Sequence, residues 1–476
     1  MVTDAQSDVN ELRSNGQTMR RGQCVARRGS EVVSQVSRCT MNTLLVLAAV
    51  LLATPARGQD LSGAKTLSVV PQTEAQLKEL IKLFDAGQYD FWREPRDMGM
   101  SVDIMATASQ VQELTAALER SGLKPQVKVD DVAQMVMRQN SGVYSRGARS
   151  LDWEDYHDSY TVSRQPTRLD GFTCHASSLP CPQINRWMAQ LASDHPDLCT
   201  LETVGKSYEG RPMNLLTVGK GGADKPGIFI DGGIHAREWI SPATVTFLVN
   251  QLVTNSSAHD DLLSSVNFYF MPVINPDGYD YSFTDDRLWR KTRSEPASPG
   301  GCSGADANRN WDFHWMEAGT SNDSCVDNYG GSAPFSEVEM QVVRDQLTRL
   351  RNTTKVYLTF HSYGQKWMYP WGYTAALPED WQDLDRLARD AVGALKAVHG
   401  TRYQVGSSTR TIYAASGGSD DWAKGVAGIK YCYTVELRDL GTHYFTLPPS
   451  LIIPSGQETF AALKVIANFV KKTYSD

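Results

Sequence analysis

A histidine and a glutamate lie three residues apart in the motif HAREW, as His235 and Glu238. An imidazole and a carboxylate in such a pair are typical of a catalytic zinc site, which needs one more protein ligand and an open position for water. The apolar run 228–230 predicts a buried strand before the pair, and Ser241 and Pro242 predict the N-cap and first residue of a helix after it. We therefore expect a metal site in a turn between strand and helix. The alternative is a surface turn that carries both residues by chance.

Two more candidates lie in or behind strand-like runs farther along the chain. His361 follows the apolar run 356–360, which would place it at a strand end as the third metal ligand. Taken alone, a histidine there is more often structural. Glu436 lies within the run 433–437, where a carboxylate is costly unless it is paired or takes part in chemistry. The alternative for Glu436 is an ion pair with Arg438.

Arginine and asparagine side chains supply groups that bind carboxylates. Asn308 and Arg309 are neighbours in the motif DANRNW. A planar guanidinium group can bind a carboxylate through two parallel hydrogen bonds, so this pair is a candidate anion site. Arg287 and Arg290 lie in RLWRKTR, which taken alone could be a basic surface run.

Two domains are expected to position these groups. From about residue 150 to the end, strand-like and helix-like runs alternate, which predicts a single α/β/α sandwich around a mixed, mostly parallel sheet. Ligands bind such folds beyond the C-terminal ends of the strands, where the candidate residues lie. Residues 60–140 follow a β-α-β-β-α-β order, which predicts a small α+β open sandwich of the ferredoxin-like kind without catalytic residues.

The N-terminal segment contains a pattern typical of a secretion signal. The apolar run 44–53 is too short to span a membrane, and small residues follow it, which predicts a signal peptide over residues 41–58 that starts at Met41. Residues 1–40 are interpreted as an extension of the gene model. The alternative is a signal anchor with a short cytoplasmic tail. The formal net charge of −7 gives no reason to expect nucleic-acid binding.

Secretion implies an oxidising compartment, where cysteines form disulfides. Cys302 and Cys325 bracket a loop rich in Gly, Ser and Asn, and we expect them to be bonded. Cys174 and Cys181 are a second candidate pair. The two remaining cysteines behind the signal, Cys199 and Cys432, are either buried thiols or an unexpected pair.

A polar link between the two domains contains Arg146 and Arg149 among small residues. A trypsin-like protease cuts such sequences, and a small domain without a site ahead of such a link is typical of a zymogen. We therefore expect residues 59–149 to be an activation propeptide and residues 150–476 the catalytic domain. The alternative is an ordinary basic linker.

From about residue 60 to the end, the chain closely resembles the secreted pancreatic-type zinc carboxypeptidases of the A/B family. The motifs that carry the resemblance occur in the family's order: HAREW, NPDGY, RLWRKTRS, DANRNW, HSY, IYAASGGSDDW and YTVELRD. The resemblance implies a monomeric exopeptidase with one Zn²⁺ per chain, secreted to the extracellular space, for example a digestive lumen. It implies peptide or protein substrates with a free C-terminus, an activating trypsin-like protease, and no stable association with membranes.

The resemblance also implies roles for single residues. The zinc ligands would be His235, Glu238 and His361, with Glu436 as general base and Arg290 facing the scissile carbonyl. Asp306 would orient His235. The substrate's terminal carboxylate would be held by Asn308, Arg309 and Tyr413. Further residues would line the cleft, namely Arg237, Arg287, Ser362, Tyr363 and Phe445.

The stretch SGGSDDW bears on which C-terminal residue is removed. By resemblance, Asp420 lies at the base of the pocket for that side chain, where the B-type enzymes carry an aspartate and prefer Lys or Arg. The extra residue within 423–428 could instead leave Asp420 as a solvated loop acid, with an A-type preference for aromatic or aliphatic residues. Further departures from the family are 440–443 and 165–180. An inactive, peptide-binding relative is a third interpretation.

Overall fold

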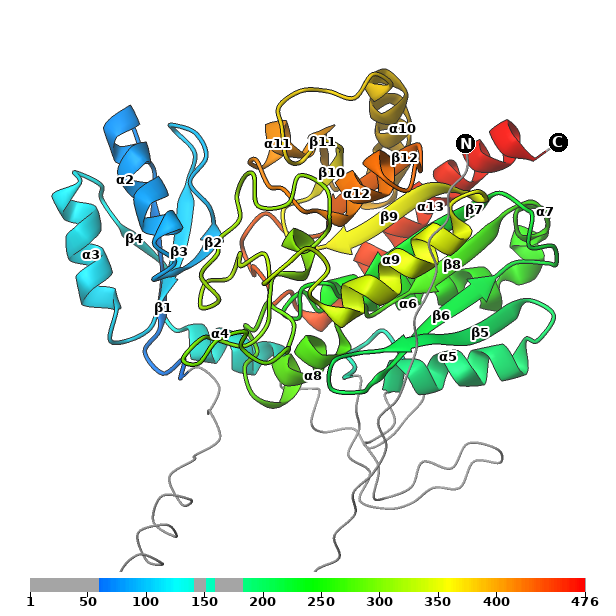
Figure 1. Ribbon diagram of the computed structural model, residues 1–476, viewed down its shortest axis with the longest axis horizontal. Helices are drawn as coiled ribbons and strands as arrows, with labels where there is room; N and C mark the ends of the chain where they lie inside the picture. The colour runs from blue at the N-terminus through cyan, green and yellow to red at the C-terminus, as the bar shows by residue number, and fades with distance from the viewer. Residues whose placement is uncertain (1–59, 141–150, 159–182, 476) are drawn as a thin grey trace, which may run out of the picture. The chain divides into compact units, whose positions relative to one another are not determined.

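An eight-stranded mixed sheet forms the centre of the large domain (Figure 1). The computed structural model describes residues 60–140, 151–158 and 183–475. The strands follow the order β11-β10-β12-β9-β7-β8-β6-β5, and the neighbours β12, β9, β7 and β8 run parallel. Their bounds are β5 Cys199–Lys206, β6 Pro212–Val218, β7 Gly227–Gly232, β8 Asn267–Met271, β9 Thr354–His361, β10 Lys366–Tyr369, β11 Gln404–Ser407 and β12 Tyr431–Glu436.

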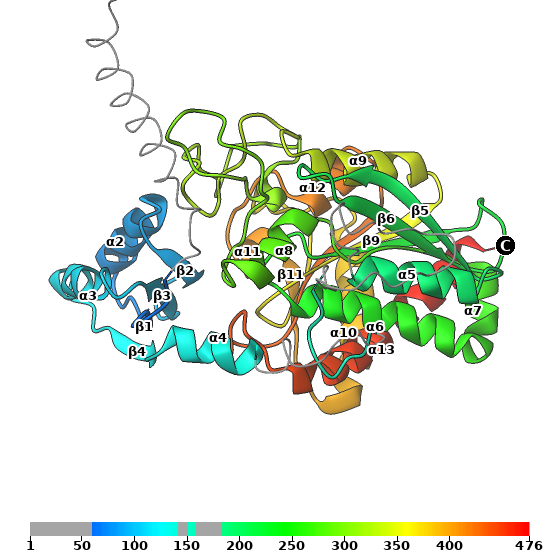
Figure 2. The same ribbon diagram turned by 90° about the horizontal axis from the view of Figure 1, so that it is seen from below.

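Helices cover both faces of this sheet (Figures 1 and 2). One face packs against α5 (Gln183–Asp194), α6 (Ile240–Thr254), α10 (Trp381–His399) and α13 (Ile452–Tyr474). The other face packs against α9 (Val338–Leu350) and α12 (Ser419–Gly425). Shorter helices complete the domain: α7 Asp260–Ser265, α8 Pro276–Thr284, α11 Ser408–Thr411, η1 Ser256–His259, η2 Ala307–Arg309 and η3 Pro449–Leu451.

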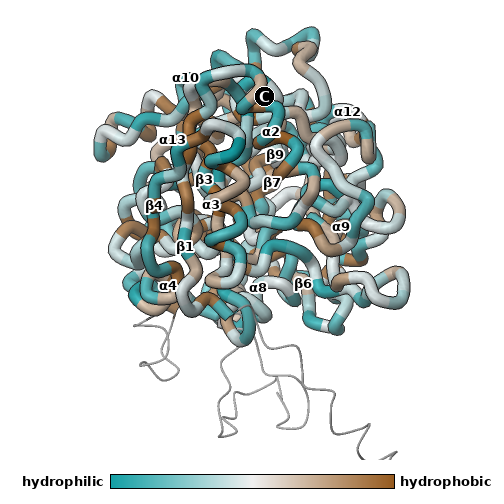
Figure 3. Tube along the Cα trace, turned by 90° about the vertical axis from the view of Figure 1, so that its left-hand side faces the viewer, coloured by the Kyte–Doolittle hydropathy of each residue, from teal (hydrophilic) through white to brown (hydrophobic). Residues whose placement is uncertain are grey.

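The core follows from the alternation of side chains along the strands. In β7, Ile228 and Ile230 point into the cluster beneath α6, while Phe229 between them points into the cluster beneath α9. A parallel strand that is covered on both faces needs apolar residues at consecutive positions, which is why β7 reads as a continuous apolar run. Figure 3 shows hydrophobic residues along α13, which packs on one face of the sheet. The predicted α/β/α sandwich is confirmed.

The small domain, residues 60–140, is a four-stranded antiparallel sheet in the order β2-β3-β1-β4 with helices on it. Its elements follow the β-α-β-β-α-β order that the sequence predicted. Thr73 and Gln76 form a capping box, in which each side chain accepts from the other residue's backbone. Its elements are β1 Lys65–Val69, α2 Glu74–Asp85, β2 Asp90–Arg93, β3 Val102–Ala106, α3 Val111–Arg120, β4 Gln126–Val129 and α4 Val132–Asn140.

The predicted helix start at Ser241 is wrong, and Glu458 shows a similar departure from what its local sequence suggests. Ser241 does not cap α6, which begins at Ile240. Its hydroxyl accepts from the Gly233 amide at 3.0 Å and donates to the Phe360 carbonyl at 2.6 Å, so it joins the turn after β7 to the end of β9. Glu458, whose spacing from a serine resembles a capping box, lies inside α13, where its carboxylate binds Arg438. Each polar side chain has a tertiary partner that local sequence cannot reveal.

The predicted disulfide between Cys302 and Cys325 is present, and Cys199 and Cys432 are buried free thiols. Cys174, Cys181, Arg146 and Arg149 lie outside the described residues. Within the described ranges, none of the helices combines the length and the apolar character needed to cross a membrane.

Candidate active site

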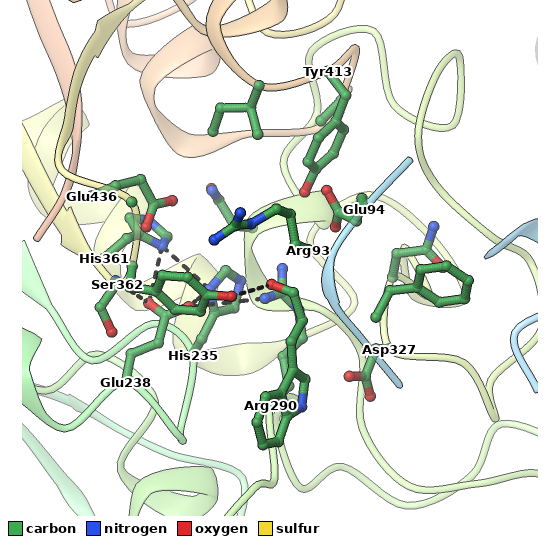
Figure 4. A pocket seen from close by; sticks show the side chains of 18 of the residues that line it. Arg93, Glu94, His235, Glu238, Arg290, Asp327, His361, Ser362, Tyr413 and Glu436 are labelled. Atoms are coloured by element: carbon green, nitrogen blue, oxygen red, sulfur yellow. Dashed lines mark hydrogen bonds and ion pairs between the residues drawn. The ribbon is translucent and has the colours of Figure 1, made fainter. Parts of the chain in front are cut away.

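Three potential metal ligands converge at the C-terminal edge of the sheet. His235 and Glu238 lie in the turn between β7 and α6, and His361 is the last residue of β9. Because β7 and β9 are parallel neighbours, their C-terminal ends meet. The His235 Nδ1 atom lies 2.8 Å from Glu238 Oε1 and 3.2 Å from His361 Nδ1. All three side chains are buried, and Figure 4 shows them pointing toward one another.

Asp306 fixes the orientation of the first ligand. Its carboxylate lies 2.9 Å from His235 Nε2 and accepts from Arg290 Nη2 at 2.8 Å. Burial alone would raise the pKa of Asp306, but Arg290 and His235 hold it well below its usual range. A carboxylate at Nε2 favours the imidazole tautomer with its proton on Nε2, and in this tautomer the lone pair on Nδ1 faces Glu238.

This donor set fits zinc. A lone pair on Nδ1 of His235 that faces a buried carboxylate and the Nδ1 atom of His361 is repulsive unless a cation lies between them. Two imidazole nitrogens and one carboxylate oxygen are the ligands of a catalytic zinc site with an open position. In the described part of the chain, these residues are the one group of at least three such side chains close enough to hold a metal.

Glu436 lies next to the triad as the last residue of β12. It is in register with His361 across the parallel pair of β12 and β9, so the two side chains emerge on one face of the sheet. Burial raises the pKa of Glu436 to about 7. The alternative of an ion pair with Arg438 is wrong, because Arg438 binds Glu458, with its Nε 3.0 Å from Oε2.

Arg309, Asn308 and Tyr413 lie together on the other side of the cavity. Arg309 Nη2 donates to the Tyr413 hydroxyl at 3.1 Å, and Asn308 Oδ1 accepts from the Ser419 amide at 2.9 Å. The Asp306 side chain caps η2, which carries Asn308 and Arg309. Gly417 packs so closely on η2 that a Cβ there would lie 2.4 Å from the Arg309 carbonyl oxygen.

Asp420 lies in the wall of the same cavity, which has a volume of about 730 Å³. The residue is 5% exposed, so it is not a solvated loop acid. Ser408 Oγ lies 3.5 Å from its carboxylate, and no ion pair with Asp420 occurs among the described residues. The neighbouring Asp421 has a structural role instead, because its carboxylate accepts from the amides of Gly372 and Tyr373 at 2.9 and 3.0 Å.

The remaining predicted cleft residues have different surroundings. Arg237, Ser362, Tyr363 and Phe445 line the cavity, and the Arg237 guanidinium lies 4.2 Å from the centre of the Phe445 ring. Arg287 does not line it, which corrects the prediction. Its guanidinium donates to the carbonyls of Arg237 and Phe445 at 2.8 and 2.6 Å and stacks on the indole ring of Trp239. Arg287 therefore stabilises the backbone of two residues that line the cavity.

The small domain contributes part of the wall of this cavity, which the sequence did not reveal. Residues 88–94 line it, and Asp90 accepts from Arg237 Nη1 at 3.0 Å. Arg96 donates to the backbone carbonyls of Arg410 and Thr411. Glu94 lies beside Tyr413 in Figure 4, and burial raises its pKa to about 7. These contacts join residues far apart in the chain, so no local pattern signals them.

A site of this kind, at the carboxyl edge of an α/β sheet, defines a metallohydrolase whose substrate carries a carboxylate. Residues 184–462 match the zinc carboxypeptidase family, and residues 67–139 match the carboxypeptidase activation peptide. The chain therefore belongs to the zinc carboxypeptidase family and carries an activation peptide. It is a zinc-dependent peptidase.

Individual relatives agree with this assignment. The chain is 62% identical over 325 residues to carboxypeptidase B of Astacus astacus, covering 68% of this chain and 100% of the relative. It is 37% identical over 415 residues to carboxypeptidase A2 of Mus musculus, covering 86% and 94%. The crystal structure of thrombin activatable fibrinolysis inhibitor is 35% identical, with a TM-score of 0.75 over 86% of this chain and 99% of that chain.

Proposed function

We propose that this zinc carboxypeptidase is a secreted, monomeric zymogen that removes C-terminal lysine and arginine from peptides and proteins. One observation carries the specificity: Asp420 is a buried carboxylate in the cavity wall without a cationic partner among the described residues. A substrate lysine or arginine would supply that partner. The name carboxypeptidase B of the Astacus astacus relative supports the proposal, although a relative named carboxypeptidase A2 also matches.

The catalytic roles follow from the positions of the side chains. His235, Glu238 and His361 would hold the zinc ion, which when bound polarises a carbonyl group and lowers the pKa of water to about 7. Glu436 accepts the proton of the attacking water and transfers it to the leaving amine. Arg290, anchored on Asp306, donates hydrogen bonds to the oxygen on which negative charge develops.

Recognition of the chain end makes the enzyme an exopeptidase. In this proposal, Arg309, Asn308 and Tyr413 bind the free α-carboxylate of the substrate, and Asp420 binds its last side chain. Arg309 and Tyr413 already contact each other, so the carboxylate meets preorganised donors. An internal peptide bond has no carboxylate to offer these groups, and its chain would have to continue through the wall that carries Arg309 and Tyr413.

The activation peptide keeps the enzyme inactive by occupying the cleft. Asp90 holds Arg237, and Glu94 lies where the substrate's carboxylate would meet Arg309 and Tyr413. We propose residues 59–149 as the propeptide, cut at Arg146 or Arg149 by a trypsin-like protease, and residues 41–58 as the signal peptide. The N-terminal sequence of the secreted protein, before and after trypsin, tests these boundaries.

The test of the whole proposal is an assay before and after trypsin, with substrates that end in Arg, Lys, Phe and Leu, together with zinc analysis. We expect one zinc ion per chain, activity only after cleavage, and the highest kcat/KM for Arg and Lys. Zinc binding without turnover of any substrate would favour an inactive, peptide-binding relative. Faster cleavage after Phe or Leu would assign the A-type preference.

A further inference from the structure

A lysine stands in the cleft beside the proposed general base. Lys366 begins β10, and β10 pairs antiparallel with β12 so that Lys366 lies directly opposite Glu436. Glu436 in turn lies opposite His361 on β9. Directly opposed residues project from the same face of a sheet, so His361, Glu436 and Lys366 form a row across three strands. The row joins the metal site, the base and a cation.

The ammonium group of Lys366 is available to a ligand. The residue is half-buried and lines the cavity together with Glu436 and Tyr363. Its Nζ atom lies 3.0 Å from the position of a Cβ built on Gly364, so the side chain turns back over that glycine. Among the described residues, Lys366 has no hydrogen bond or ion pair through its side chain. A cation in this state gains from any carboxylate that enters the cavity.

The activation peptide places such a carboxylate there. Burial lowers the pKa of Lys366, and the carboxylates of Glu436 and Glu94 oppose that shift. The activation peptide also brings the cationic Arg93 and Arg96 into range. Of these four charged groups, only Glu436 belongs to the large domain. When the activation peptide leaves, Lys366 loses Glu94 and faces the substrate.

The position of Lys366 indicates which substrate residue it meets. Under the proposed function, on which this inference rests, the last residue of the substrate is fixed by Arg309 at its carboxylate and by Asp420 at its side chain. Glu436 acts at the bond that precedes this residue. A side chain that reaches the neighbour of Glu436 without entering the Asp420 pocket therefore belongs to the penultimate residue.

We propose that Lys366 determines specificity at the penultimate position of the substrate, where it favours an acidic residue and disfavours a basic one. Opposite charges at a part-buried site commonly change kcat/KM on the order of tenfold. A substrate that ends in Glu-Arg would be cut faster than one that ends in Lys-Arg, because the ammonium group of Lys366 attracts the glutamate carboxylate and repels the lysine ammonium.

The experiment measures kcat/KM of the trypsin-treated protein on N-blocked dipeptides that end in Glu-Arg, Ala-Arg and Lys-Arg. We expect a Glu:Lys ratio of about ten that falls when salt is added. In Lys366→Met, and in Lys366→Gln as a second neutral variant, the ratio falls close to one; in Lys366→Arg it is retained. Lys396→Met removes an exposed lysine of α10 and leaves the ratio unchanged.

Two results would overturn the inference: a wild-type ratio of one or less, or the same ratio in wild type and in both neutral variants. Zinc content and thermal unfolding establish that each variant is folded. Cleavage of the Ala-Arg substrate by the wild-type protein tests the proposed function separately. If that substrate is cut while the ratio is one, the inference alone fails; if no substrate is cut, the proposed function fails.

Discussion

Replacing Asp420 by isoleucine should change which C-terminal residue the enzyme removes. The wild-type carboxylate is 5% exposed, and its side-chain neighbours are the hydroxyls of Ser408, at 3.5 Å, and Thr434. Burial raises its pKa, as expected for an acid that lacks a cation. The Asp420→Ile variant removes this acid and presents an apolar surface of similar size, which suits phenylalanine or leucine.

The size of the change can be worked out from this burial. A unit charge pair about 4 Å apart interacts with about 4 kcal/mol at an effective dielectric constant of about 20. The carboxylate is already removed from water in the free enzyme, so only the incoming guanidinium adds a new desolvation cost. A net loss of about 2–3 kcal/mol in Asp420→Ile corresponds to a roughly 30- to 150-fold lower kcat/KM for substrates that end in Arg.

The assay compares kcat/KM for matched substrates that end in Arg and in Phe. We expect the Arg:Phe ratio to fall by about 100-fold or more, because the Phe substrate also no longer faces an unpaired carboxylate. Asp390→Ile removes an exposed acid of α10 and should leave the ratio as it is. If Asp420→Ile keeps the wild-type ratio while its zinc content is unchanged, Asp420 does not face the C-terminal side chain and the reasoning is refuted.

Chelation of the zinc ion should abolish activity. Glu436→Gln should retain zinc and substrate binding, but its turnover should fall by about 10³-fold or more. If metal analysis showed that this variant loses zinc, Glu436 would not be a base distinct from the zinc ligands. Asp90→Asn weakens the part-buried pair with Arg237, so the isolated activation peptide should inhibit the mature enzyme about 30-fold less tightly. An unchanged inhibition constant would exclude this contact. Burial raises the pKa of Glu339 to about 8, so the folded state keeps a proton that the unfolded state releases above about pH 4.5. The free energy of unfolding therefore decreases as the pH rises from about 4.5 to about 8. At about pH 8, the free energy of unfolding of Glu339→Gln should exceed that of the wild type by about 2 kcal/mol, and the difference should shrink toward about pH 5. A difference that does not depend on pH, measured by urea unfolding, would contradict this.

The strand ends could be predicted because the sheet is buried on both faces. The run 356–360 is buried at every position and mostly apolar, so the polar residue that ends it, His361, marks the edge where ligands meet. The pairing of distant partners could not be predicted. The sequence near Ser241 does not indicate that its hydroxyl donates a hydrogen bond to the Phe360 carbonyl. The sequence near Arg287 does not indicate that its guanidinium donates to backbone carbonyls.

The contacts between the activation peptide and the large domain are the part of the site that could least be predicted from the sequence. Asp90 and Glu94 lie in and just after a short strand whose composition is ordinary. Arg237, which Asp90 binds, and Tyr413, beside which Glu94 lies, are distant in sequence. The place of Lys366 opposite Glu436 could not be predicted for a similar reason, since it depends on the register of β10 against β12. Register between strands that are far apart in the chain is set by the whole sheet.

Asp306 limits how this enzyme could be redesigned. One carboxylate touches His235 and Arg290 and caps the helical turn that presents Asn308 and Arg309. An engineer who alters the metal preference by moving His235 would shift the same carboxylate that positions the turn proposed to bind the substrate's carboxylate. Metal exchange and altered chain-end recognition are therefore coupled design problems, and mutations made separately for each should combine with strongly non-additive effects.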